Sequence, residues 1–231
     1  MSAAQQPVRS DFAVRLRTET RPDHEHVQSL PFLRALLAGE LEADAYAVML
    51  AQHYFTYQVL EAAADTMRTD RIAGPFVSDR LRRVPQLEAD LHHWLGPDWR
   101  EVIRPSAATE RYCARLREVC FDWPGGFVAH HYTRCLADLS GGQVIRRAMQ
   151  RSLTGGDQPD GAGFAFLTFD DVPSRPGVRN AYRLLLDTAG WDTREQRRIT
   201  AEVRVAYRLN AEVFTELGHR LPPRIPRPRG S

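Results

Sequence analysis

The sequence contains no lysine, because all 31 of its basic residues are arginine. Every cationic contact must therefore use a planar, permanently charged guanidinium, a group that suits carboxylate partners. There are 29 acidic residues, so the formal net charge is only +2. That charge is too small to indicate a nucleic-acid partner. The apolar share of 43% and the charged share of 26% are typical of a globular protein.

Cysteine is scarce as well. Cys113, Cys120 and Cys135 are an odd number of thiols and show no CxxC spacing. This argues against a disulfide framework and against a zinc site built from thiolates, and it favours a reducing compartment. No apolar run reaches the length of a membrane span, and the first residues, MSAAQQPVRSDF, lack the apolar segment of a signal peptide. We therefore predict a cytoplasmic protein with no membrane partner.

Alternation of apolar and polar residues, which would indicate strands, is nearly absent, and helical periodicity dominates. The sequence predicts helices at about 11–29, 31–38, 43–69, 78–95, 106–122, 125–153, 174–189 and 192–218. Between 154 and 173 lies a long loop whose apolar GFAFLTF segment is able to pack down. The polar, proline-containing ends, 1–10 and 221–231, are predicted to be flexible tails. One all-α domain over residues 11–220 follows.

Two predicted helices carry residues that helices disfavour. Pro22 lacks an amide donor, so either the first helix bends there or a new helix begins. Gly141 and Gly142 cost about 1 kcal/mol each relative to alanine in a helix interior. A glycine pair permits a kink and the close approach of a flat ligand, but it equally admits a neighbouring helix. The residues alone do not decide between these two interpretations.

Most of the eight histidines have the character of core or surface residues. There is no HExxH pattern, and no cluster of cysteine and histidine has the spacing of a zinc site. His24 differs because it follows Arg17 and Arg21 at the spacing i, i+4, i+7, which places the three on one helical face. An imidazole beside cations could ligate a metal that carries an anionic macrocycle.

Segment 125–153 holds a second pattern of chemical interest. His130, Arg134 and Asp138 fall at i, i+4 and i+8 and lead into the glycine pair. Arg134 and Asp138 could form an ordinary solvated ion pair, worth a few tenths of a kcal/mol. Alternatively, the carboxylate could hold a water beside a bound ligand. In the last helix Asn210 interrupts an apolar stripe formed with Tyr207 and Phe214, and a buried amide needs hydrogen-bond partners.

Residues 130–144, HHYTRCLADLSGGQV, resemble the distal-helix motif of heme oxygenases, approximately AYTRYLGDLSGGQ. The resemblance runs from about Leu16 to Leu217. It includes TRPDHEH at 20–26, LHHWLGPDW at 91–99, FAFLTF at 164–169, NAYR at 180–183 and LNAEVFTEL at 209–217. The distal stretch is specific, whereas the other segments add weight through their order and spacing.

The resemblance implies that His24 is the proximal ligand of heme iron, and Glu25 directly after it is similar to the bacterial branch. Gln28, one turn on, is then a candidate partner for the free ring nitrogen of His24. The residues that match propionate-binding positions have guanidinium or hydroxyl groups suited to carboxylates. They are Arg17, Tyr132, Arg179 and Arg183.

On the distal side the resemblance assigns Asp138 to a water-bearing network. Its expected companions are Arg134, Tyr57 and Asn210, with Gly141 and Gly142 letting the helix backbone press on the heme and Phe214 lining the pocket. A carboxylate acting through water delivers a proton less directly than a histidine over the iron would. One position departs from the family pattern, because Ala137 stands where the family usually has glycine. Its methyl is expected near the heme or its distal water.

The implied fold is an all-α, single-domain bundle of the heme oxygenase type, with heme between a proximal N-terminal helix and a kinked distal helix. Heme b would be both substrate and cofactor, cleaved with O2 and electrons from a reductase to biliverdin, CO and ferrous iron. The bacterial character of the match implies a ferredoxin- or flavodoxin-like electron donor, which an arginine-rich heme edge could attract. We expect a monomer or a weak dimer.

Two alternatives remain open from the sequence. A carrier that binds or delivers heme without turnover could retain His24 and the arginines. The other alternative is a different enzyme on the same scaffold, such as a di-iron oxidase or a thiamin-degrading enzyme. A di-iron site would need several carboxylates and histidines on facing helices. The residues that could be assembled into one are Glu61, Asp65, Glu88, His92 and Glu110.

Overall fold

The computed structural model describes residues 11–155 and 161–219, and within them it contains helices and no strands. The α-helices are α1 (Phe12–Glu19), α2 (Arg21–Ser29), α3 (Pro31–Ala38), α4 (Ala43–Met67), α5 (Val84–Leu95), α6 (Trp99–Val102), α7 (Ala107–Val119), α8 (Pro124–Thr154), α9 (Arg175–Thr188) and α10 (Thr193–Gly218). Three short 3₁₀ helices are η1 (Gly74–Phe76), η2 (Asp79–Leu81) and η3 (Ala165–Leu167). The predicted all-α class is confirmed. The predicted tails, 1–10 and 221–231, lie outside the described residues.

The predicted first helix, 11–29, is in fact two helices. The first ends at Glu19, and the second begins at Arg21 with Pro22 in its opening turn. Proline is tolerated there because the amides of a first turn have no partner within the helix. Of the two interpretations of Pro22, a new start is therefore the correct one.

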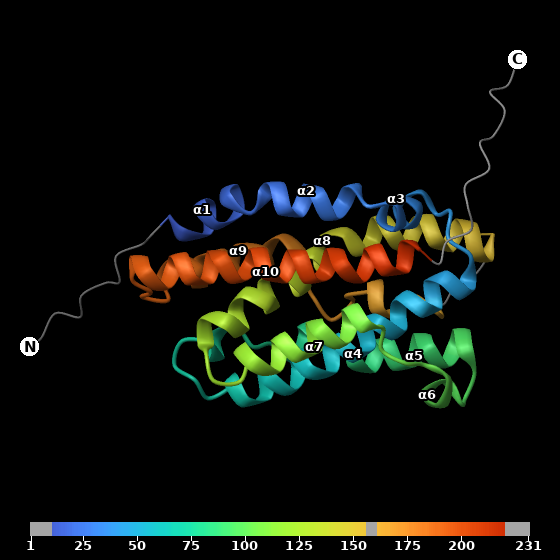
Figure 1. Ribbon diagram of the computed structural model, residues 1–231, viewed down its shortest axis with the longest axis horizontal. Helices are drawn as coiled ribbons and strands as arrows, with labels where there is room; N and C mark the ends of the chain where they lie inside the picture. Colours follow the sequence, from blue (N-terminus) through green and yellow to red (C-terminus); the bar gives the residue numbers. More distant parts are fainter. Residues whose placement is uncertain (1–10, 156–160, 220–231) are drawn as a thin grey trace, which may run out of the picture.

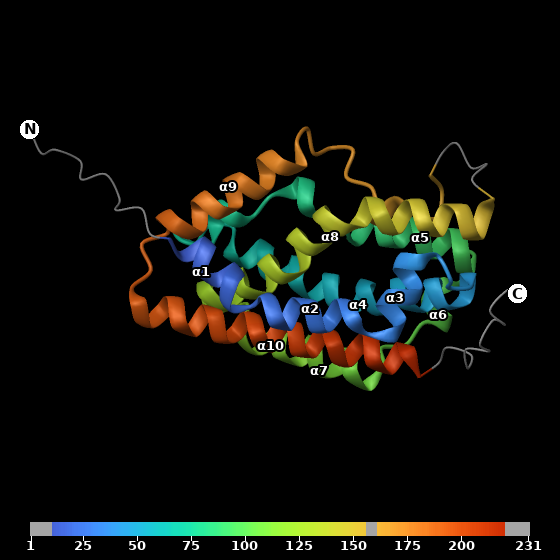
Figure 2. The same cartoon turned by 90° about the horizontal axis from the view of Figure 1, so that it is seen from above.

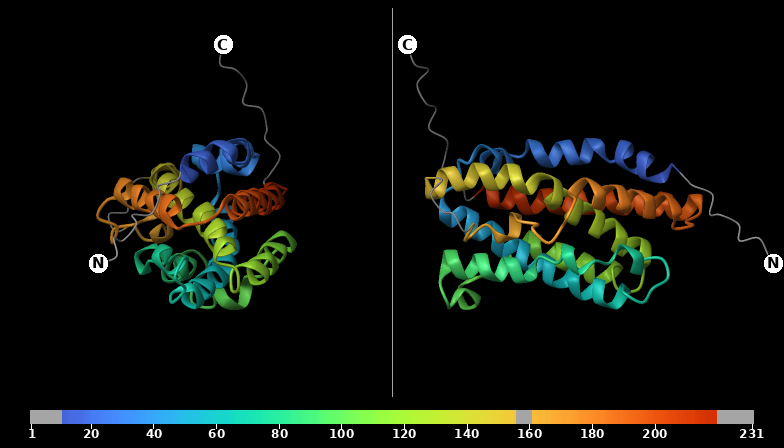
Figure 3. Two further views of the ribbon diagram at one scale, coloured as in Figure 1. Left: turned by 90° about the vertical axis from the view of Figure 1, so that its left-hand side faces the viewer. Right: turned by 180° about the vertical axis from the view of Figure 1, so that it is seen from behind.

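The helices lie in three layers (Figure 1). α1–α3 form one outer layer, α8, α9 and α10 form the middle, and α4, α5 and α7 form the other outer layer, an arrangement that Figure 3 also shows. In the middle layer α10 packs against α8 and also against α2, α3 and α7. α4 packs against α5, α7 and α8. α8 and α10 are thus the two helices that join the outer layers.

The long helix α8 is continuous, but it changes direction about midway along its length (Figure 2). The helix spans Pro124–Thr154, so Gly141 and Gly142 lie close to its centre. Glycines at such a position allow a bend because they bring neither a side chain nor a strong helical preference.

The loop after α8 is partly structured, as its apolar composition predicted. Phe164, Phe166, Leu167 and Phe169 are all buried, and the middle of the segment forms η3. The short helix α6 was not predicted, because four residues are too few for a periodic pattern to appear. Within 11–155 and 161–219, no helix has the length and apolar character to cross a membrane.

Candidate functional site

His24 lies on α2 and is half-buried. Its ring meets the edge of the Tyr207 ring on α10, with 5.9 Å between the ring centroids. Burial lowers the pKa of His24; the Glu25 carboxylate opposes this effect, and the Arg17 guanidinium adds to it. The structure thus favours a neutral imidazole, which has a nitrogen lone pair available to ligate a metal.

The side chains beside His24 are arranged differently from the sequence expectation. Arg21 forms an ion pair with Glu25 at 2.6 Å on the exposed face of α2. Gln28 is also exposed, and no hydrogen bond joins it to His24 in the described part of the chain. The break between α1 and α2 separates Arg17 from the helix that carries His24. The role predicted for Gln28 is therefore not supported by a contact.

A hydrogen-bonded cluster surrounds Asp138 on α8. The Tyr57 hydroxyl of α4 donates to Asp138 Oδ2 at 2.5 Å, and Arg134 Nη2 donates to the same oxygen at 3.4 Å. Arg134 Nη1 donates to Asn210 Oδ1 at 2.8 Å, and its guanidinium carbon lies 5.3 Å from the centre of the Tyr57 ring. The structure brings together the four polar residues that the sequence predicted for this network.

Burial sets the protonation of this cluster. It raises the pKa of Tyr57 well above its ordinary value, and the charge of Asp138 raises it further, so the phenol remains a donor. Arg134 is only 3% exposed, yet its Nε forms no hydrogen bond within the described residues. A buried polar atom of this kind is ordinarily satisfied by water or a ligand. The cluster therefore has an unused donor next to Asp138.

One face of α10 connects the two halves of the site. Tyr207 contacts the His24 ring, and Asn210, one turn further on, accepts the hydrogen bond from Arg134. The contact of Tyr207 was not predicted, because a tyrosine in an apolar stripe is usually a core residue. Its spacing of i, i+3 from Asn210 was the available sign.

The two central glycines of α8 have different surroundings. A Cβ built on Gly141 would meet nothing within 4 Å, and Ala137, one turn earlier on the same face, is exposed. A Cβ on Gly142 would lie 3.0 Å from the backbone oxygen of Leu167. Gly142 thus admits a neighbouring helix, η3, which was one of the two interpretations of the glycine pair. The Ala137–Gly141 face, in contrast, is not filled by any of the residues that the structure describes.

The predicted propionate-binding side chains come from three helices. Three of these side chains are arginines, Arg17 of α1 and Arg179 and Arg183 of α9. None of the three forms an ion pair with a carboxylate in residues 11–155 and 161–219. Arg179 donates to Ser140 Oγ at 3.4 Å, next to Gly141. Tyr132 of α8 is half-buried; burial raises its pKa, and the charges of Arg183 and Arg17 oppose that rise. Three cations that have no acidic partner within the described residues therefore lie around the stretch of α8 between Tyr132 and Ser140.

Phe214, the remaining predicted site residue, is a core residue in this structure. Its ring stacks on Phe32 at 5.9 Å and meets the edge of His53 at 5.8 Å. Among the described residues, its ring contacts are with Phe32 and His53 and not with the polar cluster. Phe166 was not predicted as part of the site, but its ring packs against Tyr57 with 5.8 Å between centroids.

The carboxylates required by a di-iron site do not converge. Glu61 accepts the amides of Arg83 and Val84, Asp65 pairs with Arg82, and Glu88 pairs with Arg100. Among the residues that the structure describes, no group of three or more His, Cys, Asp or Glu side chains could hold a metal ion. The described residues thus give that alternative no support.

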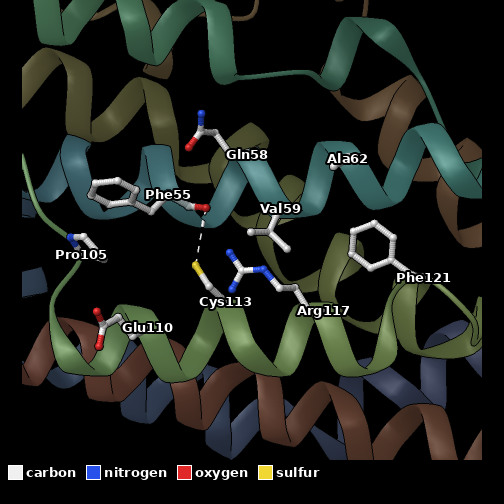
Figure 4. A pocket seen from close by; sticks show the side chains of 9 residues that line it. All are labelled: Phe55, Gln58, Val59, Ala62, Pro105, Glu110, Cys113, Arg117 and Phe121. Atoms are coloured by element: carbon white, nitrogen blue, oxygen red, sulfur yellow. Dashed lines mark hydrogen bonds between the residues drawn. The ribbon is translucent and has the colours of Figure 1, made fainter. Parts of the chain in front are cut away.

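A cavity of about 440 Å³ lies elsewhere in the molecule, between α4 and α7 (Figure 4). Cys113 and Phe55 both line it, and the Cys113 thiol points from α7 to the Phe55 carbonyl oxygen on α4, 3.5 Å from Sγ. None of the predicted site residues lines it. It lies in the outer layer opposite α2 and is separate from the site around Asp138.

Comparison with known proteins gives consistent matches over nearly the whole chain. A family model described as heme oxygenase matches residues 10–216. The chain is 31% identical to the heme oxygenase of Guillardia theta and 34% identical to heme oxygenase 1 of Homo sapiens, over 90% of this chain and 86% and 72% of those proteins. The crystal structure of heme oxygenase-1 from the cyanobacterium Synechocystis, in complex with heme, has a TM-score of 0.84 at 31% identity, covering 90% of this chain and 92% of that one.

Proposed function

The chain belongs to the heme oxygenase family, and from this we propose how its own residues bind and cleave heme. Members of the family are oxidoreductases that degrade heme, and heme is the ligand of this chain. The proposed reaction uses O2 and electrons from a reductase and yields biliverdin, CO and ferrous iron. Bound heme supplies both the iron that activates oxygen and the ring that is cleaved.

The proposal is supported most directly by the position of the Asp138 cluster. Asp138 lies next to the unfilled Ala137–Gly141 face of α8, and α10 joins this cluster to the neutral imidazole of His24. A flat ligand between α2 and α8 would have a nitrogen ligand on one side and a hydrogen-bonded carboxylate on the other. A carrier would need the first of these features but not the second.

We assign the iron ligand to His24. Its lowered pKa keeps the ring neutral at physiological pH, so ligation does not require the loss of a proton. The Tyr207 ring restricts the orientation of the imidazole. The loss of His24 should therefore change the ligation of the iron rather than the fold.

We assign the propionates to Arg17, Arg179 and Arg183, with Tyr132 as a neutral donor. These arginines have no carboxylate partner in the described structure, so a bound dicarboxylate would not need to displace one. Losing one charge-assisted contact typically costs about 1.5–3 kcal/mol, or roughly ten- to a hundredfold in Kd. The Arg179→Ala/Arg183→Ala pair tests this through heme affinity and the ratio of bilin isomers. An unchanged affinity and ratio would make them surface charges.

Asp138 has the proton-handling role in this proposal. The Tyr57 hydroxyl and the Arg134 guanidinium hold its Oδ2. No donor from residues 11–155 and 161–219 reaches the other carboxylate oxygen, which would bind water beside heme. Delivery of a proton through water keeps the carboxylate away from direct contact with the reacting oxygen. Gly141 permits the close approach of the ligand, because its backbone carries no side chain into that space.

The electron donor that we propose is a small ferredoxin- or flavodoxin-like protein with its reductase. Exposed arginines near the site, such as Arg17 and Arg183, would attract an acidic surface. The expected state of the protein is a monomer or a weak dimer, which light scattering would measure. A cytoplasmic location stays a prediction, and it agrees with three cysteines that are all free.

The decisive assay combines the protein with one equivalent of heme, an electron-donor system and oxygen. A Soret band at one heme per chain, followed by its loss and the growth of a bilin absorption, is the expected result. Persistence of the Soret band through many equivalents of reductant would contradict the oxygenase proposal and leave heme binding alone. Carbon monoxide release, measured in the same samples, separates specific cleavage from bleaching.

A further inference from the structure

The buried carboxylate of Asp90, on α5, is not explained by the reaction. Asp90 is fully buried, and its two oxygens accept hydrogen bonds from two successive backbone amides. Oδ1 accepts from Ala165 N at 2.7 Å, and Oδ2 accepts from Phe166 N at 2.8 Å. Both donors belong to η3, so one side chain holds the start of that short helix.

A second side chain holds the end of the same segment. Arg83 is 2% exposed and donates from Nη1 to the Thr168 carbonyl at 2.6 Å. Its guanidinium also lies over the Phe169 ring, 4.1 Å from the centroid. Segment 164–169 is therefore fixed at both ends by charged groups from outside it.

The segment touches the distal site at two points. The Phe166 ring meets the ring of Tyr57, whose hydroxyl donates to Asp138. The backbone of Leu167 lies against α8 at Gly142, where even a methyl would be only 3.0 Å from the Leu167 oxygen. A displacement of η3 would therefore move Tyr57, α8 or both.

We propose that Asp90 is a positioning residue for the distal site, acting through η3 on Tyr57 and on the centre of α8. Asp90 does not touch the expected heme face. It determines where Phe166 and Leu167 lie, and these determine the position of the Asp138 cluster. The structural part of the inference needs no ligand, whereas its effect on heme cleavage rests on the proposed function.

The chemistry of Asp90 also makes it suitable for substitution. Burial raises the pKa of Asp90 to about 7, while the two amides and the charge of Arg83 act in the opposite direction. Asp90→Asn keeps the shape and one acceptor oxygen, replaces the other with an NH2 group that cannot accept, and removes a buried charge. We expect this variant to fold. A control for the change from aspartate to asparagine is Asp70→Asn. Asp70 accepts two backbone amides, from Ile72 and Ala73, but both on Oδ1, so asparagine can keep both bonds, and its turn is remote from η3.

The test uses the full chain without heme. Amide hydrogen exchange at Ala165 and Phe166 should be about tenfold faster in Asp90→Asn than in the wild type. In NMR spectra, the Arg134 Nε–H and Tyr57 ring resonances should shift in Asp90→Asn and stay in place in Asp70→Asn. The proposal is overturned if amide exchange becomes faster in Asp90→Asn while the Arg134 and Tyr57 resonances do not shift. Asp90 would then hold η3 in place without affecting the distal site.

A second variant covers the case in which Asp90→Asn does not fold. Phe166→Leu keeps the amide contacts but removes the ring that packs on Tyr57, and the Arg134 resonance should again move. An unmoved Arg134 resonance would contradict the proposal. With heme, both variants should alter the bilin isomer ratio. Shifted resonances in a protein that makes no bilin would instead refute the proposed function while leaving the structural coupling intact.

Discussion

Tyr57 and Asp138, from α4 and α8, share a hydrogen bond of 2.5 Å that crosses from an outer layer of the bundle to its middle layer. The tyrosine is 1% exposed and its pKa is raised, so the donor in this pair does not ionise at physiological pH. The direction of the hydrogen bond is therefore fixed. Protein donors occupy one oxygen of the Asp138 carboxylate, and none from the described residues reaches the other, which can bind a ligand or water.

Replacing Asp138 with Ala should leave heme affinity near native and reduce bilin formation by about a hundredfold or more, as is typical for a proton-transfer group. Tyr57→Phe should have a smaller effect of the same sign, about tenfold, because it removes only one donor to the carboxylate. Single-turnover bilin yield is the measurement. Tyr54→Phe is the matched control on α4, since its hydroxyl contacts Glu88 and Gln58 instead. A native bilin yield in Asp138→Ala would refute the role.

His24→Ala should abolish histidine ligation in the ferric spectrum, and added imidazole should restore a histidine-like spectrum. His26, two residues later and exposed, provides the control: His26→Ala should retain the native spectrum. Optical and resonance Raman spectra distinguish these cases. The assignment is wrong if His24→Ala keeps histidine ligation and normal turnover without added imidazole.

The two glycines should respond oppositely to alanine. Gly141→Ala should leave the heme-free protein as stable as the wild type or stabilise it by up to about 1 kcal/mol, because alanine is the better helix former and nothing lies within 4 Å. Its heme affinity and bilin yield should fall. Gly142→Ala should destabilise the heme-free protein, since the Leu167 oxygen lies 3.0 Å from the new methyl. Denaturant unfolding and heme titration of both variants test this, and equal stabilities would contradict it.

Ala137 should permit oxygenation, because it lies on an open face and the bend of α8 allows the helix to stand slightly farther from the heme. Ala137→Gly should then change the affinity for distal ligands such as azide by roughly fourfold, the worth of about one methylene contact. The bilin yield of a single turnover is measured on the same proteins as the azide titration. A native protein that makes no bilin, together with an active glycine variant, would show that the methyl blocks the reaction.

Glu202 should make stability depend on pH in the acid range. Burial alone would raise its pKa, but hydrogen bonds from His130 and Arg115 outweigh burial and hold it at about 2, below its ordinary 4.5. The pKa of Glu202 is thus lower in the folded protein than in the unfolded chain. The ionised carboxylate therefore stabilises the fold fully above about pH 4.5, and this stabilisation is lost as the pH falls toward 2. It amounts to at most about 3 kcal/mol.

Glu202→Gln should therefore lower stability at pH 7 and flatten its dependence on pH between about 4.5 and 2. Urea unfolding over that range is the measurement. Glu212→Gln removes a more exposed pair, with Arg111 on α7, and should cost no more than about 1 kcal/mol. If the stability of the wild type and of Glu202→Gln depends on pH equally between about 4.5 and 2, Glu202 is not the group responsible.

The sequence predicted the helices and the Arg134–Asp138 pairing for the same reason, which is that both depend on spacing within a helix. Tyr57 and Asn210, which lie on other helices, were assigned to the cluster only through the resemblance to heme oxygenases. Arg134 and Asp138 are one turn apart, so their pairing follows from the period of 3.6 residues. At Pro22 the residues alone do not distinguish a bend from a new helix, because both fit the same sequence. The contact of Tyr207 with His24 and the burial of Phe214 depend on how α10 lies against α2 and α3, which no local pattern contains.

The glycine pair is a clearer case in which the sequence does not predict the surroundings of a residue. Adjacent in sequence and identical in type, Gly141 and Gly142 point to different surroundings, and only the position of η3 tells them apart. Resemblance to a family identifies such a pair without separating the glycine that faces the ligand from the glycine that the fold requires. Ser140 and Phe166 gained their contacts with Arg179 and Tyr57 in the same way, from segments distant in sequence.

The position of α10 has a consequence for the order of events during synthesis. His24 leaves the ribosome long before Tyr207 and Asn210, the two residues that join the two sides of the site. Contacts between such distant parts of a chain form late, since a long loop must close first. A nascent chain that lacks α10 thus has neither the ring beside His24 nor the acceptor for Arg134. The protein can accordingly capture heme in a productive orientation only after α10 has been synthesised.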